Sequence, residues 1–193
     1  MTRKKARFFG SPKNLQEKTD SFLIQRTKYI NEEKVWFSLD ETSFGRNGKQ
    51  MMGYAPKGHQ LRIKRNQPSM KTISSLVIAS QNGIFKQKEY VGSYNTELFM
   101  SFLNELNLPN NSVILLDNVS FHHSKQVKEW ASRNNICLLF TPPYSPWYNP
   151  IEGVFSIVKR SFYKHGDIEE AFATVQNQHC SAFFNKSFSD NPF

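Results

Sequence analysis

Three acidic residues, Asp40, Asp117 and Glu152, are placed where they could act on one substrate. Converging carboxylates suit phosphoryl transfer with divalent metal, because hard oxygen ligands bind Mg²⁺ or Mn²⁺ and two ions can serve the attacking and leaving oxygens. Without a cation the acids would repel, since two unit charges about 4 Å apart cost roughly 4 kcal/mol at an effective dielectric near 20. His and Cys clusters with zinc spacing are absent from the sequence. The acids therefore predict a metal site if the fold brings them together.

Two of these acids close predicted strands. Asp40 ends the segment Lys34–Asp40 (KVWFSLD), and Asp117 ends the aliphatic run Ser112–Asp117 (SVILLD), which has the pattern of a strand buried on both faces. Ligands of open α/β sheets gather at the carboxyl ends of strands, so the two acids would meet if the strands are neighbours. The alternative is that each aspartate only forms a turn or caps a helix.

The third acid follows a rigid turn. In the segment Thr141–Lys159 (TPPYSPWYNPIEGVFSIVK), prolines keep the chain out of a helix until Asn149, a predicted N-cap, and Pro150, a predicted first helical residue. A helix is therefore expected from about Pro150, with a buried apolar stripe and with Glu152 off that stripe. The alternative role for Glu152 is structural, because a glutamate here can reach back to the helix cap.

These segments carry a resemblance to a known family. The blocks FSLDETSF at Phe37–Phe44, ILLDNVSFHHS at Ile114–Ser124 and the Thr141–Lys159 segment resemble the catalytic domain of DDE transposases of the IS630 and Tc1/mariner group. Glu152 lies 35 positions after Asp117, which leaves 34 residues between them, a spacing typical of this group. The resemblance covers roughly residues 35–164. Resolvases and retroviral-type integrases use similar acids but lack the YSPxxNPIE turn.

The resemblance implies both a fold and a reaction. The implied fold is an α/β, ribonuclease H-like (retroviral integrase-like), mixed five-stranded sheet flanked by helices. The three acids would bind two Mg²⁺ ions, for which Mn²⁺ can substitute, and one ion would activate water to cut DNA. The freed 3′-hydroxyl would then attack target DNA. The expected partner is double-stranded DNA, as element ends and target, bound by a homodimer. Supporting positions are Asn118, His122, Asn149 and Pro150.

Periodicity gives the expected elements. Strands are expected at Lys34–Asp40, Gln50–Tyr54, Lys71–Ser80, Gly83–Val91, Ser112–Asp117 and Ile136–Phe140, and helices at Asn14–Ile30, Asn95–Leu106, Ser124–Asn134 and from Pro150. Strands first and alternating helices and strands later give a mixed sheet flanked by helices. The expected organisation is a basic linker with one helix at 1–33, a catalytic domain at 34–175 and a C-terminal tail at 176–193.

The charge favours a polyanionic partner. The chain has 193 residues, a net charge of +9 and a pI near 9.6, and Lys and Arg contacts to phosphate supply most non-specific DNA affinity. Lys159 and Arg160 are candidates for DNA phosphate, although a solvated helix face explains them equally well. Arg62, Lys64 and Arg65 could follow a DNA backbone or could protect an edge strand by their charge.

Other residues carry weaker indications. His122 and His123 are possible metal ligands, but a supporting place near the metals is favoured. Glu41 is expected to point away from Asp40, on the opposite side of the strand. Cys137 and Cys180 suit a reduced protein without disulfides.

The sequence also bears on location and completeness. We expect an intracellular protein located with its DNA, in a bacterial cytoplasm and nucleoid or a eukaryotic nucleus, because no apolar run approaches membrane-spanning length and no signal peptide is recognised. No helix-turn-helix region of the kind that precedes the catalytic domain in the family is recognised. A decayed or domesticated transposase fragment that binds DNA without cutting is therefore the alternative function.

Overall fold

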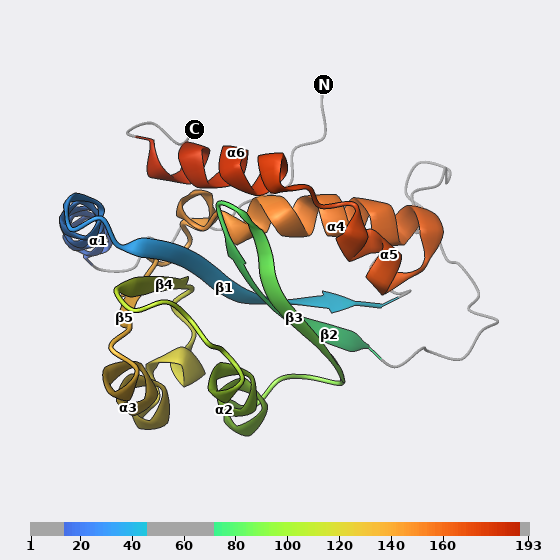
Figure 1. Cartoon of the computed structure of the whole chain (residues 1–193), viewed down its shortest axis with the longest axis horizontal. Helices are drawn as coiled ribbons and strands as arrows, with labels where there is room; N and C mark the ends of the chain where they lie inside the picture. The colour runs from blue at the N-terminus through green and yellow to red at the C-terminus, as the bar shows by residue number, and fades with distance from the viewer. Residues whose placement is uncertain (1–13, 46–71, 190–193) are drawn as a thin grey trace, which may run out of the picture.

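The computed structural model describes residues 14–45 and 72–189. The expected strand at Gln50–Tyr54 and the basic residues Arg62, Lys64 and Arg65 lie outside these described residues. Within them, the chain folds into a central sheet with helices on both faces (Figure 1). None of the helices in the two described stretches is both long and apolar enough to cross a membrane.

The sheet has five strands in the order β3-β2-β1-β4-β5. Their bounds are Val35–Phe44 for β1, Ile73–Ser80 for β2, Gly83–Val91 for β3, Ser112–Leu116 for β4 and Cys137–Phe140 for β5. β1, β2 and β3 pair antiparallel, whereas β1, β4 and β5 pair parallel. The expected mixed, ribonuclease H-like sheet is thus confirmed.

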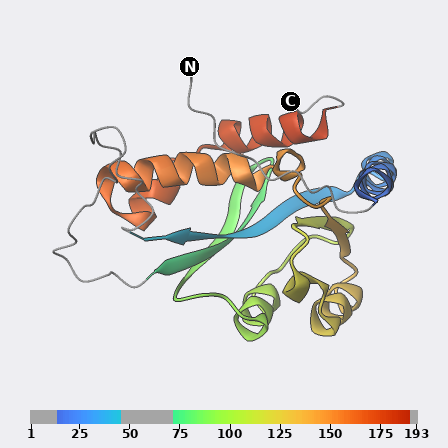
Figure 2. The ribbon, with the colours of Figure 1, turned by 180° about the vertical axis from the view of Figure 1, so that it is seen from behind.

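Helices cover the two faces unequally, as the two opposite views show (Figures 1 and 2). One face carries α2 and α3, at Thr96–Asn104 and Lys125–Arg133, and the other carries α1, α4, α5 and α6, at Leu15–Asn31, Ile151–His165, Ile168–Ala173 and Asn177–Phe188. Short 3₁₀ turns occupy Ser120–His123 and Pro146–Tyr148. Asn95 and Ser124 cap α2 and α3, and the side chain of each accepts a hydrogen bond from a backbone N–H of its helix.

The alternation of side chains along β1 explains the two layers. Phe37 and Leu39 belong to the core under α2 and α3, while Phe44 belongs to the core under α4, α5 and α6. All five residues of β4 are buried, as expected for a central strand covered on both faces. The same alternation puts Asp40 on the face that α4 covers.

One strand differs from the expectation. β1 was expected to end at Asp40 but continues to Phe44, so Asp40 lies inside the strand. The reason is that β2 pairs with β1 from Phe37 to Phe44, whereas the pairing with β4 stops at Ser38. Asp40 therefore lies just beyond the end of the parallel pairing although its own strand continues.

Two helices were not expected from the sequence. α5 follows α4, and its N-cap Asp167 accepts a hydrogen bond of 2.7 Å from the Glu170 N–H. α6 occupies the segment that we set apart as a C-terminal tail, and it buries Cys180 and Phe184 against the rest of the chain. Its burial depends on contacts with distant elements, which a local periodicity does not reveal.

Candidate active site

Asp40 and Asp117 are brought to the same level by the parallel pairing of β1 and β4. Ser38 is paired with Leu115. Asp40 lies two residues after Ser38, and Asp117 lies two residues after Leu115. Residues two apart in a strand point to the same face. The two acids thus come together on one side of the sheet even though 76 residues separate them in the sequence.

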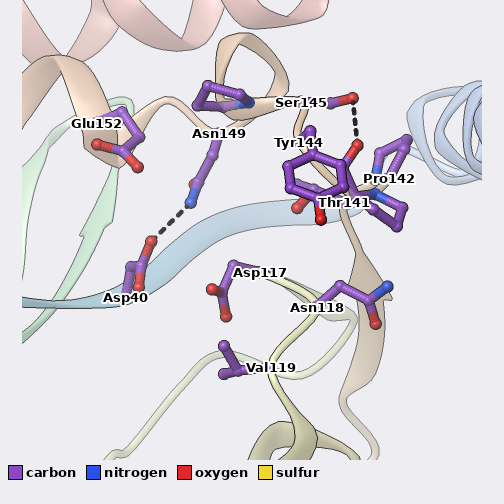
Figure 3. Close-up of a pocket in the computed structure, with 12 residues that line it drawn as sticks. Asp40, Asp117, Asn118, Val119, Thr141, Pro142, Tyr144, Ser145, Asn149 and Glu152 are labelled. Atoms are coloured by element: carbon purple, nitrogen blue, oxygen red, sulfur yellow. Dashed lines mark hydrogen bonds between the residues drawn. The ribbon is translucent and has the colours of Figure 1, made fainter. Parts of the chain in front are cut away.

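Glu152 reaches the same place from the other direction. The turn of Thr141–Pro150 crosses from β5 to α4, whose second residue is Glu152. Asp40, Asp117 and Glu152 all line one pocket of about 450 Å³, together with Asn118, Val119, residues 141–146 of the turn and Asn149. Figure 3 shows the three carboxyl groups directed toward the same space. Asp40 is nearly buried, whereas Glu152 is exposed.

The Asp40 carboxylate is held by hydrogen bonds on both oxygens. Its Oδ1 accepts from the Glu41 N–H over 2.7 Å, and its Oδ2 accepts from Nδ2 of Asn149 over 3.0 Å (Figure 3). Oδ1 of Asn149 in turn accepts from the hydroxyl of Ser38. We expected Asn149 to cap α4, but its side chain makes no cap hydrogen bond, and Pro150 takes the cap position.

Burial and charge make Asp40 unusual among the acids. The pKa of Asp40 is raised to about 8. Loss of water on burial is the largest cause, and the negative charges of Asp117, Glu152 and Glu41 contribute in that order. The hydrogen bond from the Glu41 N–H opposes this shift only in part. A carboxylate in such surroundings is stabilised in its ionised form by a nearby cation.

Asp117 contacts a buried histidine from the opposite layer. Nδ1 of His122 lies 2.8 Å from Oδ1 of Asp117 and 3.3 Å from its backbone oxygen. His122 is fully buried between the rings of Phe99 and Phe121, with centroid distances of 4.7 and 4.3 Å. Within the described residues, the contact between this nitrogen and Oδ1 of Asp117 is an ion-pair distance that lacks the direction of a hydrogen bond.

The neighbouring histidine has a different partner. Nε2 of His123 bonds Oδ1 of Asn118, and its ring stacks on Phe140 with a centroid distance of 4.0 Å. His123 therefore fixes the side chain of a pocket residue rather than an acid. Burial lowers the pKa of His123, and the positive charge of Lys128 lowers it further.

The acids fit a hard divalent cation by their chemistry. They offer only carboxylate oxygens, and the raised pKa of Asp40 reflects first its loss of water and then the negative charges of Asp117 and Glu152. In residues 14–45 and 72–189, however, no three His, Cys, Asp or Glu side chains are arranged so that they could hold an ion as they stand. The site has the right donors but not a closed coordination shell.

The remaining expected residues are distributed around this pocket. Lys159 and Arg160 lie on α4, outside the pocket lining, and Nζ of Lys159 lies 6.0 Å from the ring centroid of Phe155. Pro150 is buried behind the turn. Glu41 faces away from Asp40 and lines a separate pocket of about 270 Å³ with Tyr94 and Ser74.

Two residues of the site were not predicted from the sequence. Ser38 lies behind the pocket, where its hydroxyl donates to Asn149, and its place on the same strand face as Asp40, two positions earlier, is a sign that the sequence carries. Tyr144 lines the pocket with 78% of its surface exposed and with a positive φ of 59°. The three prolines around it hold the turn in which it lies.

The sequence of the central region shows to which family the chain belongs. A model of the family described as DDE superfamily endonuclease matches residues 34–174. The chain belongs to the DDE superfamily endonucleases. No curated protein matches the chain.

Solved structures support the same fold for this DDE endonuclease. The Mos1 transposase paired-end complex with left transposon end has a TM-score of 0.73 and 16% identity, covering 97% of this chain and 63% of that one. The catalytic domain of Mos1 mariner transposase has a TM-score of 0.66 and 12% identity, covering 95% of this chain and 92% of that one. The resemblance to the Tc1/mariner catalytic fold is thus confirmed, and the chain spans 63% of the longer Mos1 protein.

Proposed function

We propose that this chain is the catalytic part of a transposase that cuts DNA and transfers a strand of a mobile element. The observation that carries the proposal is the meeting of Asp40, Asp117 and Glu152 in one pocket. Mos1 transposase, which shares the fold, has been solved as a strand transfer complex and in paired-end complexes with Mn and with Mg. The proposal extends this type of chemistry to the present chain.

The three acids are proposed to hold two Mg²⁺ ions, with Mn²⁺ as a substitute. When bound, such ions supply an activated attacking oxygen and charge stabilisation at the leaving oxygen. Asp40 and Asp117 present their carboxylates from adjacent strands, and Glu152 approaches from α4. Asn149 and His122 contact Asp40 and Asp117 respectively and restrict their movement.

DNA is the proposed partner, as element ends and as target, and the chain would act wherever that DNA lies. Lys159 and Arg160 lie on α4 about two helical turns after Glu152 and are proposed to contact phosphates. The net charge of +9 supports such binding. We further propose a homodimer on DNA, which sedimentation of the chain with and without element-end DNA would test.

Nicking of element-end DNA tests the catalytic proposal. With Mg²⁺, the wild-type chain should nick, and Asp117→Asn and Glu152→Gln should each lose at least about 100-fold in rate because removing a ligand of a catalytic ion removes electrostatic stabilisation. Glu97→Gln, an exposed acid on α2 across the sheet, is the matched control and should nick normally. Full nicking by Asp117→Asn would refute the assignment.

The alternative is a fragment that binds DNA without cutting. One observation favours this alternative. Among the described His, Cys, Asp and Glu side chains, no three lie close enough together to hold an ion without moving. The same assay separates the two functions. Binding in a gel without cleavage of any supplied terminus, in Mn²⁺ as well as in Mg²⁺, would favour the fragment.

A further inference from the structure

Three buried polar side chains form a chain of hydrogen bonds that ends on Asp40. The Ser38 hydroxyl donates to Oδ1 of Asn149, and Nδ2 of Asn149 donates to Oδ2 of Asp40. The exposed fractions of Ser38, Asn149 and Asp40 are 0, 4 and 8%. Because water scarcely reaches these groups, a lost hydrogen bond among them would not be replaced by the solvent.

The position of Ser38 determines which end of the Asn149 amide faces Asp40. Ser38 and Asp40 are two residues apart on β1, so both point to the face from which Asn149 approaches. The ionised carboxylate, which is the form that binds a cation, can only accept a hydrogen bond, whereas the hydroxyl can donate one to the amide oxygen. The reversed amide would place its oxygen against the carboxylate. Ser38 therefore stabilises the orientation in which Asn149 donates to Asp40.

Asn149 also connects two of the three acids. Its side chain holds the carboxylate of Asp40, and its backbone oxygen accepts a hydrogen bond of 3.2 Å from the Glu152 N–H. One residue thus contacts both the strand that carries Asp40 and the first turn of the helix that carries Glu152. The position of this helix relative to β1 depends on the same contact.

We propose that Asn149, oriented by Ser38, is a positioning residue that sets Asp40 relative to Glu152 and thereby raises the affinity of the pocket for divalent cations. The inference rests on the proposed function, since it takes this pocket to be the cation site. With Oδ1 bound by the Glu41 N–H and Oδ2 by Asn149, each oxygen of Asp40 keeps one lone pair for a cation. Without Asn149 the carboxylate would rotate among several orientations.

Mn²⁺ binding to the full chain, without DNA, provides the direct test. Free Mn²⁺ is measured by electron paramagnetic resonance while protein is titrated. We expect Asn149→Ala and Ser38→Ala each to raise the dissociation constant by about 10-fold, the usual effect of removing a residue that supports a metal ligand. Ser75→Ala is the matched control, because Ser75 is a fully buried serine on β2 whose hydroxyl has no partner in the described stretches. It should bind Mn²⁺ as the wild type does.

A double-mutant cycle tests whether Ser38 acts through Asn149. If it does, adding Ser38→Ala to Asn149→Ala should change the dissociation constant by less than about 2-fold. Effects that multiply would show that the two residues act independently and would overturn this part of the inference. A merely structural role for Ser38 would lower the melting temperature without this dependence on Asn149.

The outcomes distinguish the inference from the proposed function. If Asp40→Ala weakens Mn²⁺ binding but Asn149→Ala and Ser38→Ala bind as the wild type does, the positioning role is wrong and the cation site stands. If Asp40→Ala binds Mn²⁺ normally, the pocket is not the cation site and the proposed function fails. Should Asn149→Ala not fold, Ser38→Ala decides the question, because it removes a single oxygen atom.

Discussion

At the scale of single residues, the buried carboxyl group of Asp40 makes the metal-free fold sensitive to pH. Its pKa is raised from 3.8 to about 8 in the folded chain, so between these values the folded chain binds a proton that the unfolded chain releases. Stability from this group is therefore present below pH 4 and is lost as the pH rises toward 8. Asp40→Asn removes the titration.

We expect the free energy of unfolding of the wild type to fall relative to that of Asp40→Asn between pH 5 and pH 8. A pKa difference of one between folded and unfolded chain corresponds to about 1.4 kcal/mol, so a relative loss of about 3 to 4 kcal/mol is expected over this window of three pH units. Urea unfolding of both proteins in a metal-free buffer measures it. Parallel curves for the two proteins would contradict the expectation, while saturating Mg²⁺ should reduce the difference.

The three acids of the site could be predicted from the sequence, whereas the role of Asn149 could not. The two aspartates followed from apolar runs that end in an acid, and Glu152 followed from the proline turn and the helix start. The role of Asn149 did not follow, because a residue before Pro150 has an obvious local use as a helix cap. Its actual partners, Ser38 and Asp40, lie 111 and 109 positions away, and only the folded chain brings them near.

At the scale of elements, the contact between α4 and α6 is unusually close at Gly153, the residue after Glu152. A Cβ added at Gly153 would lie 2.5 Å from Cγ of Phe183, which is far inside van der Waals contact. Glycine is therefore needed here for the approach of two helices, despite its cost of about 1 kcal/mol relative to alanine inside a helix. The start of α4 depends on this fit.

Gly153→Ala should lower the free energy of unfolding by about 1 to 3 kcal/mol, because overpacking outweighs the gain in helix propensity. Phe183→Ala makes room for the new methyl group. In the Phe183→Ala background, Gly153→Ala should be neutral or should stabilise by up to about 1 kcal/mol. Denaturant unfolding of the wild type, the two single variants and the double variant measures whether the effect of Gly153→Ala on the free energy of unfolding changes sign. Equal destabilisation in both backgrounds would mean that the helices do not meet at this point.

Elements differ in how well local patterns specify them. β3 and β4 were expected almost as found, since each is a short run bounded by turn residues. β1 was expected too short, because its last residues are polar on one face and are held only by pairing with β2. α5 and α6 were missed, because their few apolar residues become buried only against α4 and the sheet.

At the scale of the whole molecule, α6 joins parts of the chain that are far apart in sequence. Phe188 at its end packs on Trp36 of β1 with a centroid distance of 4.7 Å, and the carbonyl of Ser187 accepts a hydrogen bond of 3.0 Å from Nη1 of Arg26 on α1. Phe184 is 2% exposed in the middle of the helix. α6 thus packs against β1 and α1, although the family match ends at residue 174.

Phe184 therefore provides a test of whether the domain extends through α6. Phe184→Ala should lower the free energy of unfolding by about 3 to 5 kcal/mol, the usual cost of removing a buried aromatic side chain, and unfolding should remain one cooperative transition. Phe85→Ala is the matched control, because Phe85 is 45% exposed on β3 and should cost much less. If Phe184→Ala changed the melting of α6 alone and left the sheet and its acid pocket at wild-type stability, the domain would end before α6. A single shifted transition, with loss of Mn²⁺ binding at the same denaturant concentration, would instead show that the acids depend on a helix that lies outside the matched family region.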